Sequence, residues 1–444
     1  MCNGSIMNKL ISFSLPLMIS GILQLMFNAV DIIVVGQFTG SEALAAVGST
    51  TALIAVFTNL FIGISLGANV LAARFYAAGK HKEMSDTVHT SITLALISGI
   101  VMAFAGLLFS RLALEIMATP DNVIDQSTLY MRIYFLGMPF FMLYNYGAAI
   151  LRAVGDTKRP LLYLIISGLA NAGLNMLLVI VFHMGVAGVA IGTIVSQFIS
   201  CVLVLRCLYC SDSSYQLRFS RLTIKGKYAE QIFQVGIPAG IQSTVINLSN
   251  ALLQSSVNSF GSVAMAGYTA ANNIFGFLYV SVNSVTQSCM SFTSQNYGVR
   301  KTKRMDRVLL DCAVLSFVFS FTLGCGAYFF GDKLLRLYTS DPDVIQCGIE
   351  ILAYTTVPYF CCGIMDLIPG ALRGMGHSGV PMILSIIGTV GTRIVWIFGL
   401  FPHHRSLSFL FISYPTSWIL TIVMQVICFY FVRKKVHKTL LVTT

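Results

Sequence analysis

Asp31 is the acidic residue of this chain whose surroundings suggest chemistry. It lies in an apolar segment, residues 9–36, and Gln24, Asn28 and Asp31 follow one another at spacings of four and three. In a helix that spacing places all three side chains on one face. An ionised carboxylate facing lipid is costly, so we expect Asp31 to face an internal cavity. Burial favours the neutral form of a carboxyl group and a bound cation favours the ionised form. Asp31 is therefore a candidate proton or cation site, the alternative being a buried packing contact.

Two further apolar segments carry polar residues that could complete such a site. Asn171 and Asn175 are four residues apart in residues 160–182, and Thr193 lies in residues 187–209. Amide and hydroxyl oxygens can support a carboxylate or share a cation with it. We predict a proton or cation site formed by Asp31, Asn171, Asn175 and Thr193. Asn171 and Thr193 taken singly are more typical of helix packing.

The second half of the chain has amides where the first half has its carboxylate. At an offset of 222 the position that matches Asp31 is Leu253. The surrounding segment, residues 231–257, and the next, residues 270–296, carry amides at helical spacing. These residues either line a cavity or join helices by hydrogen bonds, and the candidate cavity-lining set is Gln24, Asn28, Asn247, Asn250, Gln254, Asn283, Gln287 and Asp366.

Two charges in the second half need partners that the sequence does not identify. Asp366 lies seven residues before Arg373, and we interpret it as either a snorkelling side chain near the cytoplasmic side or an ion ligand. Arg393 falls in the middle of an apolar segment, residues 381–401, and must find a carbonyl or an acidic group.

Enzyme and metal chemistry find little support in the sequence. Cys207 and Cys210 form a single C-x-x-C without a second pair or nearby histidines, which is weak evidence for a metal or redox site. There is no catalytic carboxylate pair within a span and no Walker A sequence. We expect no enzyme activity, no catalytic residues, no metal and no cofactor. Without a Walker A sequence the chain cannot use ATP by the P-loop route, so the energy for its work would come from a gradient of H⁺ or Na⁺.

The elements that must position these residues are membrane helices. Of the 444 residues 56% are hydrophobic and 10% are charged, and mean hydropathy is +0.79. Soluble domains carry about 25% charged residues, so the composition excludes a soluble enzyme or nucleic-acid-binding protein. We predict twelve spans, at 9–36, 45–76, 88–110, 124–150, 160–182, 187–209, 231–257, 270–296, 308–330, 345–372, 381–401 and 407–432.

The basic residues predict the orientation of these spans. Of the 28 lysines and arginines, 22 fall on the side that holds the N-terminus, four on the other side and two within spans. By the positive-inside rule both termini are cytoplasmic. The net charge of +11 is thus a signal of topology in the cell membrane, and we expect no nucleic-acid partner.

The two halves of the chain repeat. Residues 151–160 match residues 372–381 at an offset of 221, and Pro16 matches Pro238. A constant offset indicates an internal duplication. The fold class that follows is an all-α polytopic membrane protein with two six-helix lobes related by a parallel repeat. Their expected bounds are 1–210 and 230–432, with a cytoplasmic linker at 211–229 and a basic tail at 433–444.

Two kinds of small motif bear on how the helices pack and bend. Three G-x-x-x-G pairs, beginning at Gly63, Gly188 and Gly236, allow close helix approach. Pro16 and Pro238 lie inside spans at matching places, where each removes a backbone hydrogen bond. They are candidate hinges for alternating access, although many membrane helices contain proline without a moving role.

The sequence resembles the multidrug and toxic compound extrusion (MATE) family of antiporters. The segments that carry the resemblance run through both halves: Pro16, Asn28 to Gly36, Ala43 to Gly48, Leu151 to Asp156, Gly185 to Thr193 and Leu372 to Gly376. The resemblance implies export of cationic or amphipathic drugs and toxins in exchange for protons or sodium. It also implies a cation site in the N-terminal lobe, where Asp31 matches the first-helix aspartate.

The chain departs from the family pattern at one position of that site. Asn175 stands where members with the full site have a second aspartate, so the resemblance leaves the ion open. We expect small-molecule organic substrates, lipid contacts and a monomer. The alternatives are a flippase for a lipid-linked sugar or cell-wall precursor and, more remotely, a membrane-embedded enzyme or scaffold.

Overall fold

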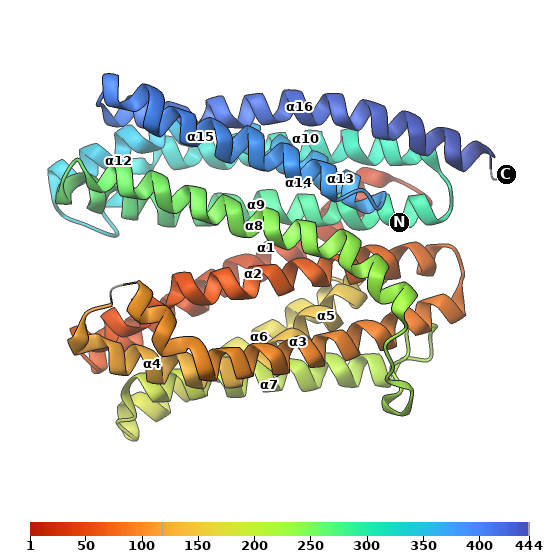
Figure 1. Ribbon diagram of the computed structural model, residues 1–444, viewed down its shortest axis with the longest axis horizontal. Helices are drawn as coiled ribbons and strands as arrows, with labels where there is room; N and C mark the ends of the chain where they lie inside the picture. Colours follow the sequence, from red (N-terminus) through yellow and green to blue (C-terminus); the bar gives the residue numbers. More distant parts are fainter. Residues whose placement is uncertain (118, 443–444) are drawn as a thin grey trace. The chain divides into compact units, whose positions relative to one another are not determined.

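The computed structural model describes residues 1–117 and 119–442, and the regular elements in these residues are helices (Figure 1). The first half of the chain forms α1 Ile6–Phe38, α2 Ser41–Ala77, α3 His81–Ile116, α4 Asp121–Leu136, α5 Met138–Val154, α6 Lys158–Asn175, the π-helix η1 Met176–Val181, α7 Gly185–Tyr209 and the 3-10 turn η2 Phe219–Arg221. The second half forms α8 Gly226–Asn258, α9 Ser262–Gly298, α10 Thr302–Phe329, α11 Gly331–Leu335, α12 Pro342–Thr355, α13 Tyr359–Gly374, α14 Gly379–Ser385, the π-helix η3 Ile386–Gly391, α15 Thr392–Val395, the π-helix η4 Trp396–Leu400, the 3-10 turn η5 Phe401–His403 and α16 Leu407–Val442.

These helices account for the twelve predicted spans. Within the described residues, eight helices are long and apolar enough to cross a bilayer. Two more spans are bent pairs, α4 with α5 at 47° and α12 with α13 at 49°. The remaining two are α8 and α9, with 33 and 37 residues, whose amides make them less apolar. The predicted all-α, twelve-span fold is confirmed.

The chain forms two compact units whose bounds differ from the expected lobes. One unit, here called the N-terminal unit, is Ile19–Gly240, and the other, the C-terminal unit, joins Met1–Met18 to Ile241–Thr444. Both α1 and α8 therefore begin in one unit and continue into the other, and each changes unit two residues after its proline, Pro16 or Pro238. The expected lobes and the linker at 211–229 were set by the repeat and stay a prediction, whereas these units are set by which segments of the backbone lie close together.

The start of α1 is held in the C-terminal unit by apolar and polar contacts. Leu10 and Phe13 are buried in a cluster with side chains of α9, α10 and α13, and the ring of Phe13 lies 5.6 Å from that of Phe292. Lys301 Nζ donates to the Cys2 carbonyl at 2.9 Å, and Arg304 Nη2 donates to the Gly4 carbonyl at 2.9 Å. These contacts explain why the first 18 residues belong to the C-terminal unit, whereas the rest of α1 belongs to the N-terminal unit.

The start of α8 packs in the N-terminal unit against α2, and the glycine pairs make this possible. A Cβ atom on Gly63 would overlap the backbone of Gly240, and one on Gly67 would overlap the Ile232 carbonyl. The two G-x-x-x-G pairs, at 63–67 and 236–240, thus face each other. Their predicted role in close helix approach is confirmed, and Tyr228 and Ile232 extend the contact as buried core residues.

The linker between the halves is docked on α3. Arg218 N–H donates to His89 Nε2 at 3.0 Å, and Lys225 Nζ pairs with Asp86 at 2.6 Å. His89 is buried, and its Nδ1 lies 2.7 Å from the Ser85 carbonyl. That geometry places the ring proton on Nδ1 and leaves Nε2 as the acceptor. The linker is therefore part of the N-terminal unit rather than a free connection.

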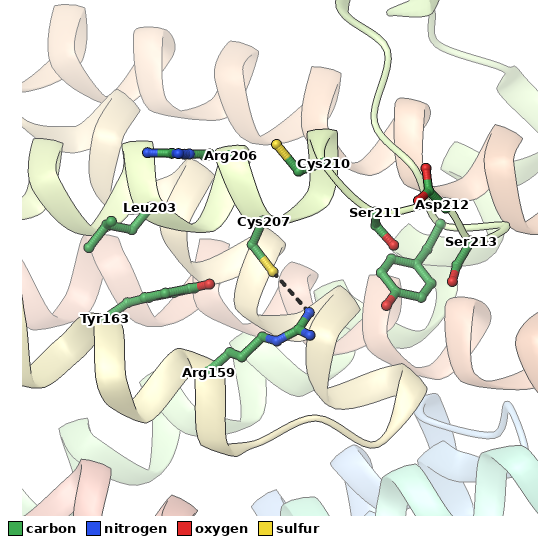
Figure 2. Close-up of a pocket in the computed structure, with 10 residues that line it drawn as sticks. Arg159, Tyr163, Leu203, Arg206, Cys207, Cys210, Ser211, Asp212 and Ser213 are labelled. Carbon is green, nitrogen blue, oxygen red and sulfur yellow. Dashed lines mark hydrogen bonds between the residues drawn. The ribbon is translucent and has the colours of Figure 1, made fainter.

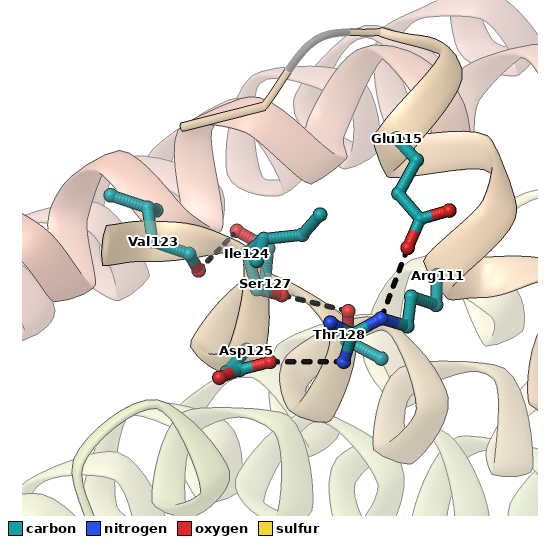
Figure 3. Close-up of polar contacts among 7 residues, drawn as sticks. All are labelled: Arg111, Glu115, Val123, Ile124, Asp125, Ser127 and Thr128. Carbon is teal, nitrogen blue, oxygen red and sulfur yellow. Dashed lines mark hydrogen bonds and ion pairs between the residues drawn. The ribbon is translucent and has the colours of Figure 1, made fainter. Parts of the chain in front are cut away.

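At the other end of α3, an exposed arginine joins the helix to α4. Arg111 Nε lies 3.1 Å from Glu115, and its Nη1 lies 3.1 Å from Asp125 (Figure 3). Exposed ion pairs of this kind contribute little to stability. The ion pair to Asp125 joins the end of α3 to α4, and Met131 and Phe135 of α4 are buried in the core cluster of this unit.

Candidate functional site

The N-terminal unit brings Asp31 together with two of its three predicted partners. Asn175 Nδ2 donates to Asp31 Oδ1 at 2.5 Å and lies 3.4 Å from Asn171 Oδ1. Both asparagines are buried, with exposures of 5% for Asn171 and 0% for Asn175, and Asp31 is half-buried. Asn175 is the last residue of α6, immediately before the π-helix η1. The site therefore consists of one carboxylate on α1 and two amides on α6.

A glycine on α7 provides the space for Asn175. A Cβ atom at Gly192 would overlap Asn175 Oδ1, so only glycine permits this approach. That oxygen is buried and has no hydrogen-bond donor among the described residues. Carboxylate and amide oxygens, as on Asp31 and Asn175, are acceptors of the kind that bind a proton or a small hard cation.

Thr193 does not join this hydrogen-bonded group. Its hydroxyl donates to the Val189 carbonyl at 2.9 Å, within α7, which is the common way for a threonine to satisfy itself in a membrane helix. Among the described residues it makes no hydrogen bond to Asp31. Its predicted part in coupling stays a prediction.

Two tyrosines on α4 adjoin the carboxylate, and sequence reasoning did not select them. Tyr130 and Tyr134 lie within electrostatic range of Asp31, and their rings stack with centroids 6.0 Å apart. Tyr130 is buried and Tyr134 half-buried. The spacing of four along α4 was visible in the sequence, but aromatic pairs are common in apolar helices, and only folding places this one near an acid.

The predicted cavity-lining amides are mostly exposed. Gln24 and Asn28 on α1, Asn247 and Gln254 on α8, and Asn283 on α9 are all exposed, and Gln287 is half-buried. None of the six has a hydrogen-bond partner among the described residues. Exposed amides at membrane depth are unfavourable against lipid, so this pattern fits side chains that meet water.

Within the C-terminal unit, the structure supplies the partner that Arg393 lacked. Arg393 is 2% exposed; its Nη1 donates to Asn250 Oδ1 at 2.6 Å, and its guanidinium lies 4.2 Å from the ring centroid of Tyr414. Asp366 is half-buried on α13, within electrostatic range of Arg373, and among the described residues it forms no ion pair or hydrogen bond.

The C-x-x-C motif lines an open cavity of about 640 Å³ at the ends of α6 and α7 (Figure 2). Arg159 Nη1 donates to Cys207 Sγ at 3.4 Å, and Cys210 is exposed. Within residues 1–117 and 119–442, His, Cys, Asp and Glu side chains form no group of three able to hold a metal. The lining residues are Arg159, Tyr163, Leu203, Arg206, Cys207, Cys210, Ser211, Asp212, Ser213 and Tyr215.

Known relatives cover nearly the whole chain. The chain is 28% identical to the probable multidrug resistance protein YoeA of Bacillus subtilis over 449 residues, which is 99% of this chain and 96% of that protein. It is 26% identical to the probable multidrug resistance protein NorM of Thermotoga maritima, over 88% of this chain and 84% of that protein.

Solved structures of MATE transporters share the fold of nearly the whole chain. A crystal structure of MATE in the bent conformation superposes with a TM-score of 0.89 at 21% identity, covering 99% of this chain and 97% of the other. An outward-facing multidrug resistance MATE family transporter superposes with a TM-score of 0.88 at 20% identity, covering 98% and 97%.

The family model named MatE matches this chain twice, over residues 16–178 and 238–398. The two matched segments fall one in each half of the repeat and together span most of the chain. The resemblance found in the sequence is confirmed, and the chain belongs to the MatE family of polytopic membrane transporters.

Proposed function

We propose that this protein exports small cationic or amphipathic organic molecules, including drugs and toxins, from the cell in exchange for protons or sodium. The family and the names of its multidrug resistance relatives support the substrate class. The observation that carries the coupling mechanism is the single half-buried carboxylate of Asp31, held at 2.5 Å by Asn175 inside a membrane helix.

The coupling follows from competition for that carboxylate. Asp31 can bind a proton, which makes it neutral, or it can stay ionised and bind a sodium ion or a cationic substrate as its counter-ion. Because these ligands exclude one another, binding of the driving ion displaces the substrate. A membrane potential of about 100 mV supplies about 2.3 kcal/mol for each charge that crosses. One coupled ion per cycle thus provides useful work.

The exposed amides supply the route by which substrate and ion reach the site. Gln24 and Asn28 lie on the same α1 face as Asp31, so a water-filled path along that face would serve both ligands. Asn247, Gln254 and Asn283 provide comparable polar surface in the C-terminal unit. In this proposal the protein is a monomer in the cell membrane, with both termini in the cytoplasm.

Alternating access would use α1 and α8 as moving connections. Each helix changes unit two residues after a proline, Pro16 or Pro238, whose ring nitrogen has no hydrogen to donate. A helix that belongs to both units must bend when they move, and bending is least costly at such a position. These prolines therefore remain our proposed hinges.

The test is ion-coupled transport by purified protein in proteoliposomes. Uptake of a fluorescent organic cation is measured under an imposed proton gradient and then under a sodium gradient, for wild type, Asp31→Asn and the control Glu230→Gln, an exposed acid on α8. Asp31→Asn should abolish gradient-driven uptake while Glu230→Gln retains it. Undiminished coupled transport by Asp31→Asn would overturn the assignment. The names of the relatives do not favour the flippase alternative.

A further inference from the structure

Arg393 places a buried positive charge in the C-terminal unit, and no acid of the residues that the structure describes neutralises it. Its side chain is 2% exposed, and its Nε–H is buried and has no acceptor in residues 1–117 and 119–442. Among the described residues no carboxylate lies within ion-pair distance of its guanidinium. Asp366 acts electrostatically on the same Cys362 thiol as Arg393, but the two do not pair. A buried charge without an opposite charge beside it is unfavourable, so an anion bound to Arg393 would be stabilising.

The groups around the guanidinium include the donors that an anion needs. Asn250 accepts from Arg393 through Oδ1, which leaves its amide hydrogens without a partner among the described residues. Tyr414 presents its ring face to the guanidinium at 4.2 Å, and its hydroxyl lies 3.5 Å from that of Tyr268. Arginine, amide and phenol together can offer N–H and O–H groups to one ligand. Such a set suits an anion.

The internal repeat relates Asn250 and Arg393 to positions near Asp31 and Asn171 in the first half of the chain. The offset of 222 that relates Pro16 to Pro238 also relates Asn28 to Asn250, and the offset of 221 relates residue 172, beside Asn171, to Arg393. In each unit a π-helix follows the helix that carries these residues: η1 follows α6 after Asn175, and η4 follows α15 after Val395. π-helical segments are rare and frequent at functional sites. The two units thus carry matched polar sites, with an acid in one and a base in the other.

We propose that Arg393 and Asn250 form an anion-binding site of the C-terminal unit, which accepts the carboxylate of an organic substrate or a small inorganic anion. Guanidinium and carboxylate geometries match, which favours the organic ligand. The inference extends the proposed function by adding carboxylate-bearing molecules to the substrates. Its binding test requires no transport, so a failure here leaves the Asp31 assignment untouched, and the reverse also holds.

The protein carries its own fluorescent reporter for this test. Its two tryptophans, Trp396 and Trp418, both belong to the C-terminal unit. Trp396 is three residues from Arg393, and the ring of Trp418 lies 5.6 Å from that of Tyr414. Tryptophan emission of the full chain in nanodiscs is recorded during titration with benzoate, with its neutral analogue benzamide, and with chloride, all at constant ionic strength.

The wild-type protein should show a saturable change with an anion and none with benzamide. Arg393→Gln should weaken that binding about tenfold or more, as expected for loss of a charged hydrogen-bond donor. Arg405→Gln, which removes an exposed arginine, is the matched control and should bind like wild type. Arg393→Lys keeps the charge without the planar fork and should give an intermediate affinity, which covers the case in which the glutamine variant folds poorly.

The three ligands separate the outcomes. Saturation by benzoate alone identifies an organic carboxylate site, and saturation by chloride that competes with benzoate identifies a general anion site; both support the proposal. Equal responses to benzoate and benzamide would overturn it, as would unchanged anion affinity in folded Arg393→Gln and Arg393→Lys.

Discussion

At the scale of single residues, the most informative position is Asn175. Its amide donates to Asp31, and the resemblance to the family implies that members with the full site have a second acid at this position. In Asn175→Asp, two carboxylates would face each other at hydrogen-bond distance and repel unless a proton or cation lies between them. We therefore expect transport by Asn175→Asp to depend more steeply on sodium or proton concentration than wild type. Initial rates over a sodium series at several pH values measure this, and superimposable profiles would contradict it.

The aromatic pair on α4 leads to a second prediction at this scale. Tyr130 and Tyr134 stack near Asp31, so a cationic substrate held at the carboxylate would meet an aromatic face. Cation–π contacts contribute about 0.5–2 kcal/mol, so Tyr134→Leu should raise KM for an organic cation by roughly 2- to 30-fold. Tyr134→Phe keeps the ring and is the control. If both variants show the same KM, the ring has no part in binding.

At the scale of elements, the crossing of α2 and α8 depends on its glycines. A Cβ atom at Gly63 would overlap the Gly240 backbone, which cannot move aside as a flexible side chain can. Overpacking of this kind costs about 1–3 kcal/mol, so Gly63→Ala should lower the thermal midpoint of the purified protein. At Gly173 in α6 a Cβ atom meets nothing within 4 Å. Gly173→Ala should be neutral or stabilising by about 0.5–1 kcal/mol, and equal midpoints for the two variants would refute this account.

At the same scale, the structure shows where Pro16 and Pro238 lie relative to the boundary between the two units. The repeat showed that Pro16 and Pro238 match, but many helices of this kind contain proline. The structure adds that each helix passes from one compact unit to the other within two residues of its proline. The boundary depends on which side chains pack with Leu10, Phe13 and Ile232, and these contacts join residues hundreds of positions apart. No local pattern contains that information.

At the scale of the whole molecule, the charge distribution predicts how the chain sits in the membrane. Cys210 is the exposed cysteine among the described residues, and it lies in the basic connection that should face the cytoplasm. A membrane-impermeant maleimide should label the protein in inside-out vesicles and leave it unlabelled in right-side-out cells. Cys210→Ser should remove the labelling. Labelling of intact cells that Cys210→Ser abolishes would reverse the orientation.

Much of this molecule was predictable from the order of its residues. The twelve spans follow from hydropathy, because a helix needs about 20 apolar residues to cross a bilayer. The duplication follows from constant offsets, and the choice of Asp31 as the candidate coupling residue follows from the cost of a charge in lipid. Helical spacing alone placed Gln24 and Asn28 on the Asp31 face, where the structure finds them exposed.

Only the tertiary structure decided which of these residues meet. Asp31 accepts a hydrogen bond from Asn175, whereas the Thr193 hydroxyl donates within its own helix. Tyr130 and Tyr134 lie near the acid. Arg393 donates to Asn250 and contacts the ring of Tyr414. The physical reason is that spacing fixes the face of a helix on which a residue lies, whereas packing of distant segments fixes the rotation of each helix against its neighbours. Hydropathy places a charge in the membrane, and only packing supplies its partner.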